Sequence, residues 1–139
     1  GGLAAARCMT LALADAGVRP EEADYINAHG TSTPLNDVAE TRAIKLALGE
    51  HARRVPVSAV KSMIGHSVGA SSAIALVATV LAMRDGRVHG TMNYEEPDPD
   101  CDLDYVPNAS RELDVKAAMV NAFGFGGHCI SLIVTRHKS

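Results

Sequence analysis

Apolar residues recur along this chain at spacings that predict helices in its first half. Residues 2–16 are rich in Ala and Leu and predict a helix that ends at Gly17, because glycine readily adopts the left-handed conformation that closes a helix. Residues 33–48 predict a second helix, since Thr33 can cap it and Pro34 suits its first position. Apolar positions with helical spacing alternate there with charged ones, as in an amphipathic helix: Leu35, Val38, Ile44 and Leu48, interleaved with Asp37, Glu40, Arg42 and Lys45.

The stretch from residue 67 to residue 83 contains no charged side chain. It is too short and too rich in Gly, Ser and Thr to predict a membrane span. A helix that is apolar on all sides is otherwise a buried one, so we expect a central helix that ends at residues 84–86.

Four further stretches are rich in β-branched and apolar residues and predict strands: residues 23–28, 55–60, 116–123 and 130–136. The last two are joined by Gly124-Phe125-Gly126-Gly127, which predicts a hairpin. Residues 88–93 predict another short strand, and residues 95–104 an acidic, solvated loop. Helices thus alternate with strands before the final hairpin, which predicts a layered α/β fold with a mixed sheet.

Composition narrows the possible functions of this chain. Its 139 residues correspond to about one domain. A formal charge of −3, a pI near 6.0 and few aromatic residues argue against nucleic-acid binding. Cys8, Cys101 and Cys129 are far apart and odd in number, which indicates neither a disulfide framework nor a metal site and favours a reducing cytoplasm. The first residues lack the pattern of a secretory signal, and we expect no membrane association.

The candidate chemistry lies just after two predicted strands, where open α/β sheets place their sites. His29-Gly30-Thr31-Ser32-Thr33 follows the first, and Lys61 and His66 follow the second across a small turn. A Lys beside an imidazole disfavours its protonation, and a neutral imidazole can donate an N–H to a developing oxyanion. The alternatives are a capped turn with a hydrogen-bonded His29, and a surface Lys61 with a helix-capping His66.

The glycine run and Cys129 are weaker candidates. The glycines at residues 124–127 can serve the hairpin alone, or bring backbone N–H groups to an oxyanion with Phe125 as an apolar gate. Cys129 follows this run, so a thiolate of low pKa is one option there. Ile130 and Leu132 instead favour a Cys129 that simply enters a strand.

Together, His29-Gly30-Thr31-Ser32-Thr33, Lys61-Ser62-Met63-Ile64-Gly65-His66 and Asn121-Ala122-Phe123-Gly124-Phe125-Gly126-Gly127 resemble the C-terminal part of β-ketoacyl-acyl-carrier-protein synthases. The elongating type II enzymes of fatty acid and polyketide synthesis are the most similar kind. The resemblance implies that residues 1–139 form a C-terminal ketosynthase domain. It also implies one half of a thiolase-like fold, incomplete at its N-terminal side.

The resemblance also implies a chemistry, a decarboxylative Claisen condensation of acyl and malonyl thioesters. His29 and His66 would stabilise charge on the malonyl thioester oxygen, and Lys61 would orient His66. Thr31 and Thr33 would bind the phosphopantetheine arm of acyl-carrier protein, and no other cofactor or metal is implied. Phe125, together with Phe123, would supply the oxyanion hole and gate. The remaining N-terminal half and a homo- or heterodimeric partner complete the expected assembly.

Several positions depart from the family's pattern. The nucleophilic Cys of the family belongs to its other half, and no Cys here has that context, so we expect a fragment or one piece of a split enzyme. A Glu that usually supports the Lys is replaced by Ala75, and the usual Thr-Asn after the glycines by His128-Cys129. A non-catalytic subunit like a chain-length factor is one alternative. A thiolase is another, which the lack of a Cys before the glycines disfavours.

Overall fold

The computed structural model describes residues 2–30, 34–59, 71–91, 102–107, 109–123 and 128–136. Its helices in these ranges are α1 (Leu3–Ala16), α2 (Pro34–Leu48) and α4 (Ser71–Asp85), with short 3-10 segments at Pro20–Glu22 and Gly49–Arg53. Gly17 closes α1 with φ of 67° and donates its N–H to the Ala14 carbonyl. The three predicted helices are therefore confirmed where the structure describes them. Residues 67–70 of the third prediction lie outside the described ranges.

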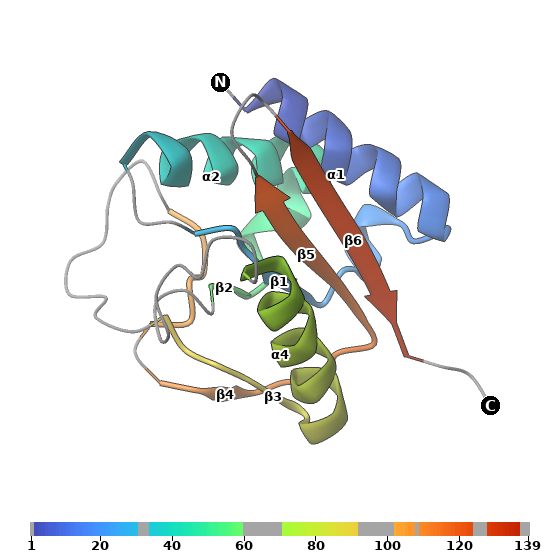
Figure 1. The fold of residues 1–139 in the computed structure, drawn as a ribbon, viewed down its shortest axis with the longest axis vertical. Helices are drawn as coiled ribbons and strands as arrows, with labels where there is room; N and C mark the ends of the chain where they lie inside the picture. The colour runs from blue at the N-terminus through green and yellow to red at the C-terminus, as the bar shows by residue number, and fades with distance from the viewer. Residues whose placement is uncertain are drawn as a thin grey trace.

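Four strands form one mixed sheet in the order β2–β1–β5–β6 (Figure 1). β1 (Tyr25–Asn27) is central and parallel to both β2 (Val57–Ser58) and β5 (Ala117–Phe123). The final strand β6 (Cys129–Thr135) pairs antiparallel with β5, so the predicted pairing of the last two strands is confirmed. β3 (Arg87–Val88) and β4 (Arg111–Glu112) form a separate antiparallel pair.

The two faces of the sheet bury different helices, which gives three layers (Figure 1). On one face, Ile26 and Met119 pack in a cluster that includes Met9 and Leu13 of α1 and Ile44 of α2. On the other face, Tyr25 and Ala118 pack with Ala82 of α4, and Val120 packs with Ala75. Neighbouring residues of β1 and β5 thus point to opposite faces, as the period of a strand requires.

Two predictions about the surface hold only in part. Within this chain the third predicted helix is not buried on all sides, because Val77, Val80 and Leu81 of α4 are 58%, 48% and 41% exposed. The acidic loop is not simply solvated at its end: Asp102 pairs with Lys45 and Arg53, and Leu103 is buried in the α1–α2 cluster. Residues 92–101 of that region lie outside the described ranges.

The predicted strands at residues 23–28 and 55–60 are longer than β1 and β2. The apolar pattern of a sequence predicts which residues are buried, but a residue belongs to a strand only if its backbone also pairs with a neighbouring strand. Val55 is fully buried, yet its N–H bonds back to the His51 carbonyl at the end of a 3-10 turn instead of entering the sheet. The strand predicted at residues 88–93 is wrong beyond its first residue: β3 ends at Val88, Thr91 forms only an isolated bridge with Pro107, and residues 92–93 lie outside the described ranges. Its partner β4 has only two residues, too few for a periodic signal.

A buried polar network ties β1 to the segment after β3. The Tyr25 hydroxyl lies 2.5 Å from Ser58 Oγ and 3.2 Å from His89 Nε2. His89 Nδ1 lies 3.3 Å from the Gly90 carbonyl oxygen, which can only accept, so Nδ1 carries the ring proton and Nε2 accepts from Tyr25. Burial lowers the pKa of His89 and raises the pKa of Tyr25. Both groups therefore stay neutral in the folded protein.

This network predicts an acid-sensitive fold. Because the folded pKa of His89 lies below its ordinary value of 6.5, the unfolded chain binds the proton more readily. The stability that neutral His89 contributes is complete above that value and is lost as the pH falls through it toward the folded pKa. Urea unfolding at a series of pH values should show a smaller acid loss for His89→Gln than for the wild type. Ser58→Ala keeps the imidazole and should retain the wild-type slope; an equal slope for both variants would contradict the prediction.

Candidate functional site

The ends of three parallel strands meet at one edge of the sheet. His29 lies two residues beyond β1, Ala59 lies directly beyond β2, and Phe123 is the last residue of β5. Parallel strands present their carboxyl ends at the same edge. The expectation that the first two strand ends lie together is thus confirmed for the strands themselves.

Gly30 allows these ends to approach each other closely. Its φ is +47°, and a Cβ placed on it would lie 2.4 Å from the Cβ of Ala59. Any other residue here would both adopt an unfavourable backbone conformation and collide with the residue that follows β2. The backbone turn after His29 therefore depends on glycine.

The His29 imidazole is held from the β5 side. Its Nδ1 accepts the backbone N–H of Phe123 at 3.3 Å, and the two ring centroids lie 5.3 Å apart. A backbone N–H can only donate, so Nδ1 is the unprotonated nitrogen and Nε2 carries the proton of the neutral ring. His29 is 8% exposed, so this donor sits in a largely dehydrated setting.

The backbone of the same turn is held by a buried carboxylate on α2. Glu40 Oε1 accepts the His29 N–H at 2.9 Å, and Glu40 Oε2 accepts the Gly30 N–H at 3.1 Å. Asn121 Nδ2 lies 3.4 Å from Oε1. Burial raises the pKa of Glu40, while these three donors act in the opposite direction. The carboxylate thus fixes two consecutive peptide units beside the imidazole.

Two asparagines extend this network across the sheet. Asn121 on β5 also accepts the Ser131 hydroxyl of β6 at 2.8 Å. Asn27 on β1 donates to the Ala75 carbonyl and to the Thr79 hydroxyl of α4, each at 3.1 Å. The polar residues at the ends of β1 and β5 thereby connect α2, β6 and α4 to one edge.

Of the predicted site residues, the structure brings His29 and Phe123 into direct contact. The Phe123 N–H is used to hold the imidazole. The other predicted site residues lie outside the described ranges, and their roles stay predictions: Thr31, Thr33, Lys61, His66 and Phe125.

Glu40 is the functional residue that sequence analysis missed. It had been grouped with the charged positions of the second helix, whereas it is 4% exposed. The signal was present, since Glu40 precedes Ile44 and Leu48 by four and eight residues and so lies on their apolar face. A single acidic residue on the apolar face of a helix indicates a buried carboxylate that accepts hydrogen bonds from buried donors.

Of the cysteines that the structure describes, Cys129 lies nearest in sequence to this edge, and its thiol is not activated. Cys129 is the first residue of β6, as expected, and burial together with nearby Cys8 raises the pKa of its thiol. This shift is opposite to that of a nucleophilic cysteine. No group of three metal-ligating side chains occurs among the described residues. No helix that the structure describes is both long and apolar enough to span a bilayer.

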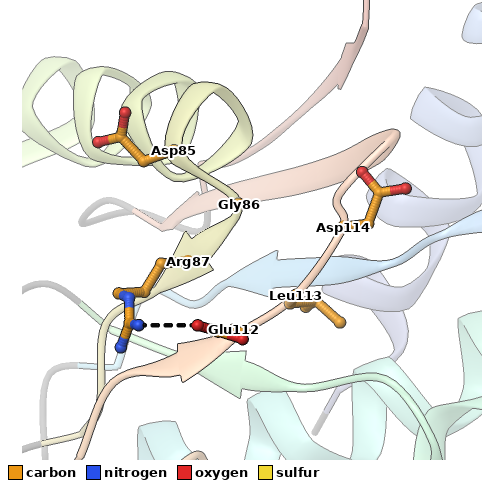
Figure 2. Close-up of a pocket in the computed structure, with 6 residues that line it drawn as sticks. All are labelled: Asp85, Gly86, Arg87, Glu112, Leu113 and Asp114. Atoms are coloured by element: carbon orange, nitrogen blue, oxygen red, sulfur yellow. Dashed lines mark hydrogen bonds and ion pairs between the residues drawn. The ribbon is translucent and has the colours of Figure 1, made fainter.

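A hollow elsewhere on the surface lies where α4 leads into β3, and Figure 2 shows its lining. Four of its six lining residues carry charged side chains, with an ion pair between Arg87 Nη2 and Glu112 Oε1 at 3.2 Å. These groups are exposed and none of them is a predicted site residue. The edge around His29 remains the better candidate.

Comparison with known proteins adds a family to this geometry. Residues 1–95 match the model "Beta-ketoacyl synthase, C-terminal domain". The chain is 55% identical over 137 residues to a "3-oxoacyl-[acyl-carrier-protein] synthase 2" of Synechocystis sp., covering 99% of this chain and 33% of that protein. It is 44% identical to the Staphylococcus aureus protein of the same name, again over 99% of this chain and 33% of that protein.

Solved structures agree with the sequence relatives. A β-ketoacyl synthase from Burkholderia phymatum superimposes with a TM-score of 0.93 at 40% identity, over 99% of this chain and 33% of that one. A type II PKS ketosynthase in complex with its acyl-carrier protein superimposes with a TM-score of 0.91 at 46% identity, over 96% of this chain and 33% of that one. The predicted thiolase-like α/β fold is thereby confirmed, and the chain spans about a third of the relatives it matches.

Proposed function

Because this chain belongs to the β-ketoacyl synthase family, through that family's C-terminal domain, we propose that it forms the C-terminal section of a 3-oxoacyl-[acyl-carrier-protein] synthase. The complete enzyme would join acyl and malonyl thioesters by decarboxylative Claisen condensation, in fatty acid or polyketide synthesis. The observation that carries the proposal is the His29 imidazole, whose Nδ1 accepts a backbone N–H at the edge where three parallel strands end.

The tautomer of His29 suits the step in which CO2 leaves. Loss of CO2 from a malonyl thioester places negative charge on the thioester oxygen. A fixed N–H donor near that oxygen stabilises the charge without reorganising water, and such donors contribute most where water is excluded. His29 Nε2–H is that donor in this proposal, and a neutral ring is needed because Nδ1 already accepts.

His29 is preorganised for this role at two points. Its peptide N–H is anchored on Glu40 at 2.9 Å, and its ring is anchored on the Phe123 N–H at 3.3 Å. These anchors come from α2 and β5, so the donor is held by regular elements on both sides. By the resemblance, His66 is the second donor and Lys61 orients it.

The nucleophile is proposed to lie outside this chain. Burial and nearby Cys8 raise the pKa of the Cys129 thiol, opposite to what a thioester-forming thiol needs, and Cys8 donates its S–H to the Cys129 carbonyl. The remaining N-terminal half would supply the Cys and cover α4, whose Val77 and Leu81 line an exposed apolar groove. Such a groove is typical of a surface that another element covers. A homo- or heterodimer of the complete enzyme is part of the proposal.

Acyl-carrier protein is the proposed partner, since a similar ketosynthase was solved in complex with its acyl-carrier protein. Thr31 and Thr33 would bind the phosphopantetheine arm, which is carried by that partner, so the chain would need no cofactor of its own. Cytoplasmic location is likewise part of the proposal.

An assay of two proteins tests this function. The complete protein that contains this chain, mixed with acyl- and malonyl-acyl-carrier protein, should release CO2 and form the β-ketoacyl product, as measured by mass spectrometry. Residues 1–139 alone should form none, because they would lack the acyl-accepting Cys. β-Ketoacyl product from the isolated chain would contradict the proposal that the nucleophilic Cys lies outside it. Absence of product from the complete protein would contradict the proposed reaction.

A further inference from the structure

We propose that Cys8 and Cys129 form an oxidisable dithiol site whose disulfide ties α1 to β6. The two residues lie 121 positions apart in the chain, yet Cys8 Sγ is 3.3 Å from the Cys129 carbonyl oxygen. Cys8 belongs to the middle of α1, and Cys129 begins β6. The site is separate from the His29 edge and does not depend on the proposed synthase activity.

The alternation of β6 places both sulfur atoms in the same interface. Cys129 and Ile133 are four residues apart, so their side chains leave the same face of the strand. Ile133 packs against the cluster that contains Met9 and Leu13 of α1, and Cys8 directly precedes Met9. Figure 1 shows α1 alongside β6. The Cys129 side chain is therefore directed toward the helix that carries Cys8.

The observed hydrogen bond shows that the side chain of Cys8 contacts the backbone of Cys129. Disulfide-bonded cysteines have Cα atoms about 4.4–6.8 Å apart. Here the sulfur of Cys8 lies 3.3 Å from the carbonyl oxygen of Cys129, and the proposal requires that rotation of the two side chains bring sulfur to sulfur. Both residues are only half-buried, so a small oxidant such as hydrogen peroxide can reach them.

The proposed reaction consumes one peroxide for each disulfide. The thiolate of one cysteine attacks a peroxide oxygen, the O–O bond breaks, and after protonation a sulfenic acid and water are formed. The second sulfur then attacks the sulfenic sulfur, the S–O bond breaks, and a second water leaves. Two thiols are oxidised by two electrons and hydrogen peroxide is reduced to two waters.

The local electrostatics predict a slow site at neutral pH. Burial and the neighbouring Cys8 raise the pKa of the Cys129 thiol, so little thiolate is present. Cys8 moreover donates its S–H to a carbonyl. Oxidation should therefore accelerate as the pH rises, since the thiolate is the attacking species. Metal binding is a poorer use of the pair, because no third ligand of the described chain joins the two thiols.

Peptide mapping tests the proposal directly. The complete protein is treated with hydrogen peroxide, its remaining thiols are alkylated, and it is digested with trypsin without reductant. Trypsin leaves Cys8 in the peptide 8–42 and Cys129 in the peptide 117–136, because Arg19 precedes a proline. A linked 8–42/117–136 peptide should appear, should form faster at about pH 9 than at pH 7, and should disappear with dithiothreitol. The oxidised protein should also melt about 2–10 °C higher.

Matched variants separate this site from general thiol oxidation. Cys8→Ser and Cys129→Ser should each abolish the linked peptide and the gain in melting temperature, whereas Cys101→Ser should retain both. Recovery of both wild-type peptides as alkylated or as separately oxidised species would overturn the proposal. So would a linkage of Cys8 or Cys129 to Cys101.

Discussion

Replacing His29 with Asn in the complete synthase is expected to lower the condensation rate by about 10²–10³-fold, the usual loss for one oxyanion donor. An Asn side chain can place its Oδ1 near the position of Nδ1 and still accept the Phe123 N–H. It has no group at the position of Nε2, so the proposed donor is lost while the anchor remains. Steady-state turnover of malonyl-acyl-carrier protein measures the effect.

Two controls isolate the donor in this experiment. His29→Gln places an amide N–H nearer to Nε2 and should recover part of the rate, although it gives up the acceptor for Phe123. Transfer of the acyl chain to the enzyme should continue in both variants, because the proposed role of His29 begins when CO2 leaves. Wild-type condensation by His29→Asn would contradict the donor role of His29.

Replacing Glu40 with Ala is expected to destabilise the protein by about 3–5 kcal/mol. The substitution leaves the buried N–H groups of His29 and Gly30 without their acceptor, at about 1–3 kcal/mol for each, and creates a small cavity. Condensation should fall with it, because His29 loses its backbone anchor. Urea unfolding measures the first effect, and turnover well below the unfolding midpoint measures the second. Glu50→Ala, at an exposed position, is the matched control and should change stability by less than about 0.5 kcal/mol.

The conservative variant Glu40→Gln adds a pH signature. Because burial raises the folded pKa of Glu40 above its unfolded value, the folded protein binds this proton more tightly. The corresponding stability is present below the unfolded pKa and is lost as the pH rises through the folded pKa. Glu40→Gln cannot titrate, so this loss of stability with rising pH should disappear from its profile. An unchanged profile would show that Glu40 does not titrate in the folded protein as described.

These two residues differ in how well sequence alone identified them. His29 stands in a motif, directly after a predicted strand and before a glycine, and both the motif and the strand order pointed to it. Glu40 lies in an ordinary amphipathic helix. Its role is apparent only from its contacts with the N–H groups of a turn about ten residues away and with Asn121 on β5. Helical spacing records which face a residue occupies, but not which polar groups that face meets.

The sequence by itself determined the three helices, the final pair of strands and the position of His29, because each depends on residues close together in the chain. It also determined the family, through three short motifs that are each local. Gly17 ends a helix by its own conformational freedom, and hydrophobic spacing sets which face is buried. Only the tertiary structure decided how β1, β2 and β5 are ordered, which imidazole nitrogen of His29 accepts a hydrogen bond, that Glu40 is buried with distant partners, and that Cys8 contacts Cys129. Those features arise from contacts between residues 10 to 121 positions apart, where hydrogen-bond geometry and desolvation, and not local propensity, set the free energy.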